Sequence, residues 1–371
     1  MFGARRPAAR PLHALIAGGG TGDATIMLAQ QLAREGRAGS VTWLDRSHAS
    51  LKTAQARAGV RGLGNIVWEQ RSLLELPGSG LGPFDYIDCC GVLHHLSDPA
   101  EGLRALLSVL APRGGLGLMV YAPHGRTGVY MLQDALRLLA PANEAPAARL
   151  EVAKRVMRHL PETAWLRRNG FLDDHVNGGD AGLYDLLLNP RDRAFTVREL
   201  HALLAGEGLT VTCWVEPARY DPIPLLPDPR LRARAEALDP IERAALAEAL
   251  AGNVSAHIVY CMRQDERVTP ADFMAADAVP VLRELSGPEL AGSIQPDGTI
   301  AFLLDGLRLP IALPPLAPAI LRLIDGRRSV AAIAASLAQH GTGEAAFQRA
   351  WRATFTALER INRLLLAAPV A

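Results

Sequence analysis

The sequence predicts an α/β fold built on a doubly wound, mostly parallel sheet. Short apolar runs alternate with longer stretches of helical periodicity through the first third of the chain, and parallel strands need such long crossovers. The first apolar run, "LHALIA", leads into the glycine-rich stretch "GGGTGD" and then into a helical pattern. A strand, a glycine turn and a helix in this order form a nucleotide-binding unit.

The elements of this first part follow from periodicity and stop signals. In the first helix, Ile26, Leu28, Ala29 and Leu32 recur at helical spacing, and Gly36 follows as a stop signal. The expected helices are Ala24–Glu35, Ser47–Gly59 and Pro99–Leu110, and the expected strands are Leu12–Ala17, 40–45, 65–70, Tyr86–Cys90 and 114–122.

Two insertions interrupt the alternation. The stretch from Pro123 to about Phe195 is helical and rich in loops, with helices expected at Val129–Leu139 and Ala147–Leu160. A helix in "TVRELHALLAGEGL" and a strand at Thr210–Glu216 then resume the sheet. A proline-rich segment and a helix at Pro240–Leu250 precede the seventh strand, "SAHIVYCMR". Insertions near one end of an open α/β sheet commonly cover a ligand pocket.

A second domain is expected after the sheet. The composition turns polar near Gln264–Pro270, so we predict one domain at residues 1–265, with the insertion at 123–195, and another at residues 270–371. The second domain should be small and α+β, and it contains the hairpin "TIAFLLDGLRLPIAL" with Asp305-Gly306 as its turn. Three helices are expected after the hairpin, at Leu316–Ile324, Ser329–Gln339 and Glu344–Leu366.

Composition excludes several function classes. A net charge of +1 predicts no general attraction to nucleic acid or to a membrane surface. No stretch is long and apolar enough to span a bilayer, and the short apolar run near the N-terminus is interpreted as the first strand rather than a signal sequence. The four cysteines fit no disulfide frame and no metal site, and they indicate a reducing, cytoplasmic compartment; they are Cys89, Cys90, Cys213 and Cys261.

The glycine turn indicates which ligand the sheet binds. Gly18, Gly20 and Gly22 alternate, whereas a dinucleotide fingerprint would need its last glycine at Asp23, where a carboxylate would face a pyrophosphate. The Gly-Lys-Ser/Thr of a P-loop is also absent. Asp45 ends the next strand, at the spacing of about twenty residues expected of a ribose-binding acid. A ribose acid without phosphate-binding groups points to S-adenosylmethionine (SAM).

Five motifs then resemble those of class I SAM-dependent methyltransferases, in the same order. They are "LIAGGGTGD", "LDRS", "SLLEL", "FDYIDCCGVLHHLSDP" and "LAPRGGLGLMVY", and they are closest to the type 11/12 group, which includes methyltransferase domains associated with tetratricopeptide-repeat proteins. The resemblance covers roughly Leu12–Arg263 and implies a Rossmann-like fold and methyl transfer from SAM. It implies cofactor contacts at Gly18, Gly20, Gly22, Leu44, Asp45, Arg46, Ser72, Leu73, Cys90 and Gly91.

The chain departs from that family at three places. The family often has an acid two residues before the first glycine, where this chain has Ile16, and another acid at the position of Ser72. The helices that usually precede the first strand are also not evident. These departures motivate the alternative of a catalytically inactive SAM-fold binding or scaffold protein. An NAD-type oxidoreductase is disfavoured by Asp23, and a DNA amino-methyltransferase is disfavoured by "DCCGVLHHL" after the fourth strand.

Candidate catalytic and substrate residues follow the fourth and fifth strands. A histidine at His94 or His95 could accept a proton from the methyl acceptor, or one could simply pack while the other is solvated. The acceptor is expected to be a small molecule or a peptide. Its contacts are expected in the segment "YAPHGRTGVY", at Tyr121, His124, Arg126 and Tyr130. The alternative is that this segment is a solvated loop.

Two further segments have more than one interpretation. The arginines of "NPRDRAFT" are expected to pair with nearby acids, or to hold an anionic substrate. The stretch "LAPAILRLIDGRRSVAAIAASL" resembles PqqD-like winged-helix modules, which implies capture of a peptide strand at the hairpin edge. The alternative, which we favour, is a domain that stabilises a homo-oligomer or shields the catalytic face.

Overall fold

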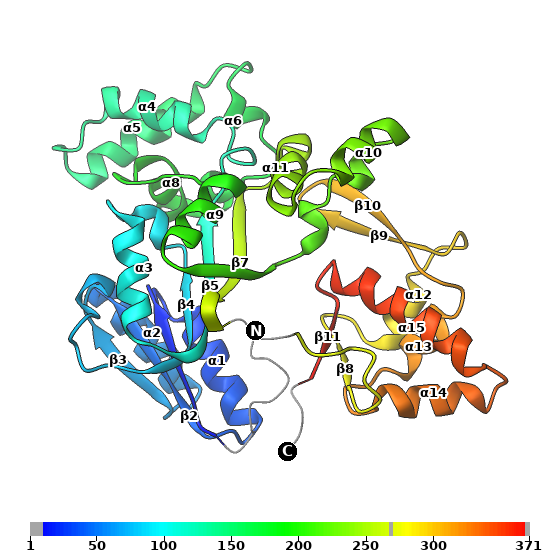
Figure 1. Cartoon of the computed structure of the whole chain (residues 1–371). Helices are drawn as coiled ribbons and strands as arrows, with labels where there is room; N and C mark the ends of the chain where they lie inside the picture. Colours follow the sequence, from blue (N-terminus) through cyan, green and yellow to red (C-terminus); the bar gives the residue numbers. More distant parts are fainter. Residues whose placement is uncertain (1–9, 267–269, 368–371) are drawn as a thin grey trace.

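A seven-stranded sheet forms the centre of the larger part of the molecule. The computed structural model describes residues 10–266 and 270–367 (Figure 1), so residues 267–269 of the expected domain boundary lie outside the described residues. The strand order is β3-β2-β1-β4-β5-β7-β6, and only β7 runs antiparallel to its neighbours. The strands are β1 (Leu12–Ala17), β2 (Gly39–Asp45), β3 (Ile66–Gln70), β4 (Phe84–Cys90), β5 (Leu110–Tyr121), β6 (Leu209–Trp214) and β7 (Ala256–Arg263).

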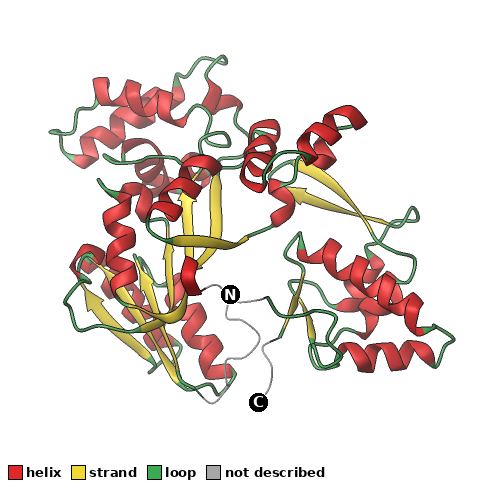
Figure 2. Ribbon diagram, in the orientation of Figure 1, coloured by secondary structure: helices red, strands yellow, loops and turns green. Residues whose placement is uncertain are grey.

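Helices cover the sheet because each strand alternates its side chains between two faces. Ile87 and Leu116 point to one face and pack with apolar residues of α3 (Pro99–Ser108) and α9 (Val197–Gly206). Ile16 points to the other face and packs with α1 (Asp23–Arg34), which α2 (His48–Val60) contacts. Figure 2 shows the strands with helices on both sides. The predicted doubly wound, mostly parallel seven-stranded α/β class is confirmed.

The first insertion packs as a small helical layer with its own apolar cluster. Figure 1 places it above the edge at which β4 and β5 end. Its buried members include Leu132, Leu136, Leu183 and Leu187. The helices are α4 (Val129–Leu139), α5 (Pro146–Arg158), α6 (Trp165–Arg168), α7 (Asp174–Asn177) and α8 (Gly179–Leu188).

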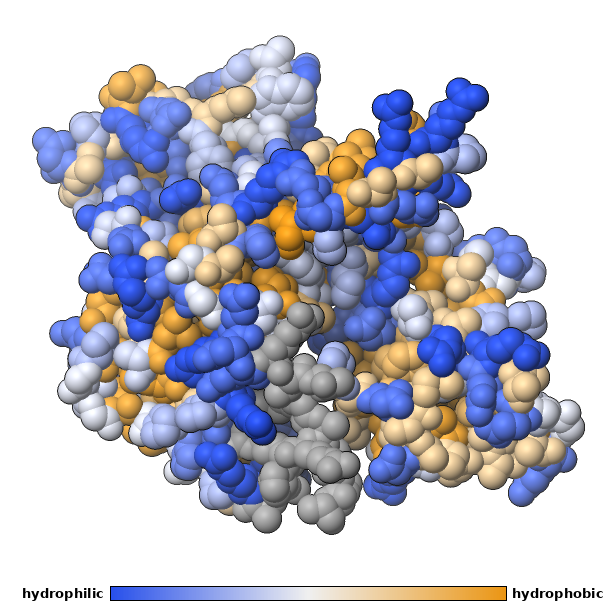
Figure 3. All heavy atoms as spheres, viewed as in Figure 1, coloured by the Kyte–Doolittle hydropathy of each residue, from blue (hydrophilic) through white to orange (hydrophobic). Residues whose placement is uncertain are grey.

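The second insertion separates β6 from β7. It comprises the short turns η3 (Pro217–Tyr220) and η4 (Ile223–Leu225) and the helices α10 (Pro229–Glu236) and α11 (Pro240–Ala251). Figure 3 shows hydrophilic side chains gathered over α10. Ala218 of η3 belongs to the apolar cluster of the C-terminal part, so this insertion connects the two parts of the molecule.

The C-terminal part has a separate apolar core around Ile320, Ile333, Trp351 and Leu358. Its contacts with the first part include the side-chain amide of Asn253, which donates to the carbonyl oxygen of Leu304 at 2.7 Å. Its elements are β8 (Pro280–Leu282), α12 (Gly287–Gly292), β9 (Thr299–Leu304), β10 (Leu307–Ala312), α13 (Ala317–Leu323), α14 (Val330–Ala338), α15 (Glu344–Glu359) and β11 (Leu364–Leu366). The expected Asp305-Gly306 hairpin turn is confirmed.

Two expected helices were too long. The last helix ends at Glu359 rather than at Leu366, because the chain turns at Asn362, whose φ is +57°, and Leu364–Leu366 pairs with β8. Helix α3 ends at Ser108 rather than at Leu110, which already pairs with Phe84 in the sheet. In both cases strand pairing with a segment far away in the sequence overrides local helical periodicity. In the described part of the chain, no helix has the length and apolar character needed to cross a membrane.

Candidate functional site

The glycine turn leaves an open space at one position. Gly18, Gly20 and Gly22 all have positive φ, at +82°, +47° and +96°. A Cβ on Gly18 would lie 2.2 Å from Val92 Cγ2, whereas a Cβ on Gly20 would meet nothing nearer than the carbonyl oxygen of Gly18 at 4.0 Å. Gly18 therefore allows the loops after β1 and β4 to approach each other. Gly20 faces space that a ligand can occupy.

Asp45 holds this turn in place from the end of β2. Its Oδ2 accepts the backbone N–H of Gly20 at 2.9 Å, and its Oδ1 accepts the backbone N–H of Ser47 at 2.8 Å. Each carboxylate oxygen retains a further lone pair. Asp45 can thus hold the turn and accept hydroxyl groups of a ribose at the same time. This second role of Asp45 was not evident from the sequence.

The other expected cofactor residues differ in what they can offer. Leu44 is buried in the core, and its carbonyl oxygen accepts the backbone N–H groups of Gly18 and Gly19, so only its backbone reaches the turn. Arg46 is exposed. The Ser72 hydroxyl accepts the backbone N–H of Leu74 and caps a short turn, in which Leu73 is buried.

The end of β4 lies beside the turn. Cys90 is exposed, and Gly91 has a φ of +78°. A Cβ on Gly91 would meet nothing nearer than Met119 Cε at 3.7 Å. The glycine turn, Asp45 and the end of β4 thus form a cradle at one edge of the sheet, and a free carboxylate lone pair beside open space fits a ligand that carries a ribose.

The two histidines after β4 differ in environment. His94 is only 1% exposed, and neither of its ring nitrogens has a hydrogen-bond partner among the described residues. Burial, with the charges of His95 and Arg126, lowers the pKa of His94 to about 3. His94 therefore stays neutral and is a weak base. This matches the alternative in which one histidine simply packs.

His95 is oriented by the insertion. Its Nδ1 lies 2.7 Å from the carbonyl oxygen of Arg191, which can only accept, so Nδ1 carries the proton and Nε2 the lone pair. His95 is partly exposed. Of the two histidines, His95 is the one with a lone pair suited to accept a proton.

The buried Arg126 stacks on the partly exposed ring of Tyr121 beneath the insertion. The Tyr121 ring lies 3.9 Å from the His94 ring and 3.6 Å from Arg126 Cζ. Arg126 pairs with Asp192 at 3.1 Å, and both side chains are at most 2% exposed. The guanidinium of Arg126 is therefore buried against a local acid rather than solvated, which differs from the alternative of a solvated loop.

The remaining expected substrate residues lie around this pair. Burial raises the pKa of Tyr130 to about 12, and its hydroxyl is buried without a hydrogen-bond partner in the described ranges. His124 contributes its carbonyl oxygen to the turn at Thr127. The hydroxyl of Tyr121 donates to Asp185 at 3.3 Å.

A half-buried acid near the cradle was not expected from the sequence. Asp88 lies on β4 and accepts a hydrogen bond from the Tyr86 hydroxyl at 3.0 Å. Desolvation raises the pKa of Asp88. The available signal was a carboxylate that interrupts the apolar run of β4. No group of three or more His, Cys, Asp or Glu side chains is arranged to hold a metal ion in the described part of the chain.

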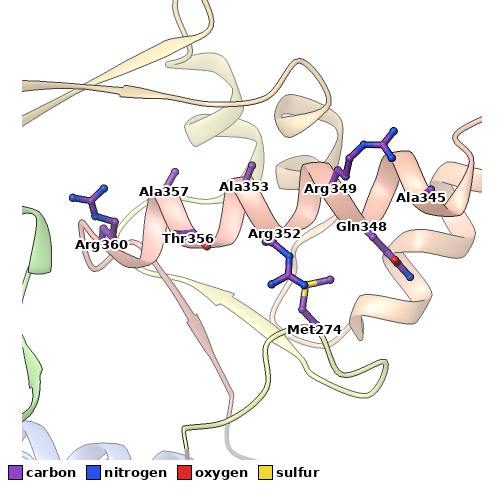
Figure 4. Close-up of a pocket in the computed structure, with 9 residues that line it drawn as sticks. All are labelled: Met274, Ala345, Gln348, Arg349, Arg352, Ala353, Thr356, Ala357 and Arg360. Atoms are coloured by element: carbon purple, nitrogen blue, oxygen red, sulfur yellow. The ribbon is translucent and has the colours of Figure 1, made fainter. Parts of the chain in front are cut away.

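A separate surface depression of about 600 Å³ runs along α15 in the C-terminal part (Figure 4). Arg349 and Arg352 of α15, Arg360 at its C-terminal cap and Met274 of the segment before β8 line it. Arg360 pairs with Asp221. None of these residues belongs to the cradle at the end of β1 and β4.

Comparison with known proteins gives matches of two kinds. Residues 15–116 match a family described as a methyltransferase domain. An uncharacterized protein of Synechococcus sp. is 33% identical over 243 residues, which are 64% of this chain and 56% of that protein. A ubiquinone biosynthesis O-methyltransferase of Caulobacter sp. is 37% identical over 101 residues, which are 27% of this chain and 38% of that enzyme. The chain thus spans about half or less of the length of these curated relatives.

Among solved structures, PKMT2 from Rickettsia typhi has a similar fold. It aligns over 98% of this chain and 72% of its own length, with a TM-score of 0.68 and 16% sequence identity. A second structure of PKMT2, in complex with AdoHcy, aligns equally well. At this identity the likeness concerns the fold, and it extends over the C-terminal part as well as the sheet.

Proposed function

The chain belongs to the class I SAM-dependent methyltransferases, and from that premise we propose that it transfers the methyl group of SAM to an acceptor bound beneath the first insertion. When bound, SAM supplies an electrophilic methyl group on a sulfonium sulfur. The observation that carries the proposal is the cradle in which Gly20 leaves an open space beside the carboxylate of Asp45.

The residues of the cradle have distinct roles in this proposal. Asp45 accepts hydrogen bonds from the ribose hydroxyls, because its oxygens retain lone pairs after holding the turn. Gly20 allows the ligand to approach the backbone. Cys90 and Gly91, at the end of β4, would lie beside the sulfonium end of the bound ligand. Binding in this cradle would present the methyl group to an acceptor beneath the first insertion.

The acceptor is proposed to be a small molecule or a peptide. Its nucleophilic atom forms the new bond to the methyl carbon while the bonding pair of the broken bond stays on sulfur, and the acceptor gives up a proton. Nε2 of His95 is the group that takes this proton if a base is needed, because Arg191 holds the proton on Nδ1. Placement alone suffices for an acceptor that is already deprotonated.

The match to a ubiquinone biosynthesis O-methyltransferase supports the shared cofactor chemistry. It covers 27% of this chain, so it does not extend to the whole acceptor side. We therefore propose no specific acceptor from it. The alternative of a catalytically inactive scaffold protein gains no support from the comparisons or from the geometry of the cradle.

The C-terminal part is proposed to brace the insertions. The tip of the β9–β10 hairpin accepts two hydrogen bonds from Asn253, and a Cβ on Gly306 would lie 3.0 Å from Phe171 of the first insertion. Arg219 pairs with Asp305 at 2.8 Å. These contacts at the hairpin tip support a shielding role, and capture of a peptide strand at the hairpin edge is the alternative. A homo-oligomer and a cytoplasmic location remain proposals from the sequence.

The proposed function is tested first by binding and then by turnover. Calorimetry of the full chain should detect binding of S-adenosylhomocysteine, and Asp45→Asn should lower the affinity for this ligand. Methyl transfer from labelled SAM is then measured with fractionated small molecules and peptides as acceptors. A folded chain that binds neither SAM nor S-adenosylhomocysteine would refute the proposal.

A further inference from the structure

Strand β4 carries an aspartate, Asp88, between two apolar residues whose side chains point to the opposite face of the sheet. Ile87 and Cys89 are fully buried in the core, whereas Asp88 shares the other face with Tyr86 and Cys90. Asp88 is half-buried, and the Tyr86 hydroxyl donates to its Oδ2 at 3.0 Å. Desolvation raises the pKa of this carboxyl group, and the thiol and backbone N–H of Cys90 partly offset that effect. The carboxylate thus lies close to Cys90, at the end of the strand.

Within the described part of the chain, Asp88 has no cationic partner. Among residues 10–266 and 270–367, no arginine, lysine or histidine forms an ion pair with it. Asp85, three residues earlier on the same strand, accepts the backbone N–H of His13 and pairs with Arg10. Taking an ionised carboxylate out of water without a cation is costly. A bound cation would offset that cost.

The sheet register places Asp88 at the cradle. Asp88 lies directly opposite Ile16 of β1, which is two residues before Gly18. On its other side it lies opposite Gly117 of β5, where a Cβ would meet the Tyr86 hydroxyl at 2.3 Å. Gly117 therefore leaves room for the hydroxyl that orients the carboxylate. The loops that follow Ile16 and Asp88 meet where Gly18 contacts Val92.

We propose that Asp88 binds the primary ammonium group of the methionine arm of SAM. The inference rests on the proposed function, since it takes SAM as the ligand of the cradle. The ammonium is a small cation with three N–H donors, and a carboxylate held by Tyr86 from one side can accept from it on the other. Ile16 has no polar group to offer, and Asp88 supplies the charge from the neighbouring strand.

Calorimetry with two ligands tests this assignment. S-adenosylhomocysteine carries the amino-acid arm, whereas 5′-methylthioadenosine has the adenosine and the thioether without that arm. Asp88→Asn should lower the affinity for S-adenosylhomocysteine about 10- to 100-fold, the range expected for a charge-assisted hydrogen bond. It should leave the affinity for 5′-methylthioadenosine within about twofold of wild type.

A matched variant controls for loss of charge. Asp134 lies on the exposed surface of α4, where it pairs with Arg137, and Asp134→Asn should change neither affinity. Tyr86→Phe keeps the carboxylate and removes its hydroxyl partner, so it should weaken S-adenosylhomocysteine binding by a smaller factor, again without affecting 5′-methylthioadenosine. This variant also serves if Asp88→Asn does not fold.

The stability of the ligand-free protein gives an independent readout. A carboxyl group whose pKa is raised by folding destabilises the native state once the pH exceeds its ordinary value of 3.8. Ligand-free Asp88→Asn should therefore unfold at the same or a higher temperature than wild type at pH 7. A purely structural role predicts a lower unfolding temperature.

The outcomes separate this inference from the proposed function. Wild type that binds neither ligand would refute SAM binding itself. Equal losses for the two ligands in Asp88→Asn, or no loss for either, would overturn the role of Asp88 while leaving SAM binding intact. A loss confined to the KM of an amine acceptor would also overturn it, because the ammonium would then belong to the acceptor.

Discussion

Substitution of Gly20 by alanine separates the ligand site from the fold. The Cβ of an alanine at this position would point into open space, 4.0 Å from the nearest heavy atom, which is the carbonyl oxygen of Gly18. The free energy of unfolding should therefore fall only by the cost of holding a non-glycine residue at a φ of +47°, which is about 1–2 kcal/mol. The same methyl group occupies the space that the ribose and the methionine arm need.

The expected result is a folded protein with impaired binding. Gly20→Ala should lower the unfolding temperature by a few degrees, since about 1 kcal/mol corresponds to roughly 2–4 °C in domains of 150–250 residues. It should lower the affinity for S-adenosylhomocysteine by at least about tenfold, which corresponds to ~1.4 kcal/mol of binding free energy. Calorimetry measures the affinity, and a thermal melt without ligand measures the stability.

Gly36 provides a matched control. Its φ is +59°, a Cβ there would meet nothing within 4 Å, and it lies just beyond α1, at the opposite end of that helix from the turn. Gly36→Ala should show the same loss of stability and no loss of affinity. If the Gly20 and Gly36 variants bind S-adenosylhomocysteine equally well, the glycine turn is not the cofactor site.

Four further substitutions test other parts of the site. Asp45→Asn should lower the affinity for S-adenosylhomocysteine about 10- to 100-fold in calorimetry, because charge-assisted hydrogen bonds from the ribose hydroxyls are lost. An unchanged affinity would contradict the proposed contact between Asp45 and the ribose. His94→Phe should reduce the acid sensitivity of the fold. Folding lowers the pKa of His94 from 6.5 to about 3, so the histidine costs no stability above pH 6.5 and about 2 kcal/mol by pH 5, because only the unfolded state then takes up the proton. Denaturant titrations at pH 8 and pH 5 measure this difference. Arg126→Met should destabilise the protein by about 3–5 kcal/mol, because it leaves the carboxylate of Asp192 buried and unpaired, and a denaturant midpoint near that of wild type would argue against a native ion pair. His95→Gln should lower turnover about 100-fold at saturating acceptor if Nε2 takes the proton, whereas a change under threefold would show that placement alone drives the transfer.

The cofactor side of the site could be predicted from the sequence because it is local. Gly18, Gly20 and Gly22 lie in one turn, and Asp45 ends the next strand, so strand-turn-helix order and spacing predict their meeting. The core strands follow from apolar runs in the same way. The two errors at helix ends, at Ser108 and Glu359, arose where pairing with a distant strand overrides local periodicity.

The acceptor side depends on contacts that no local pattern encodes. The carbonyl oxygen that orients His95 belongs to Arg191, 96 residues away, and the acid that engages Arg126 is 66 residues away. The sequence by itself determined the class of fold and the meeting of the glycine turn with Asp45, because these depend on short-range spacing. Only the tertiary structure decided that Asp88 lies opposite Ile16, since strand register is set by packing across the sheet rather than along the chain.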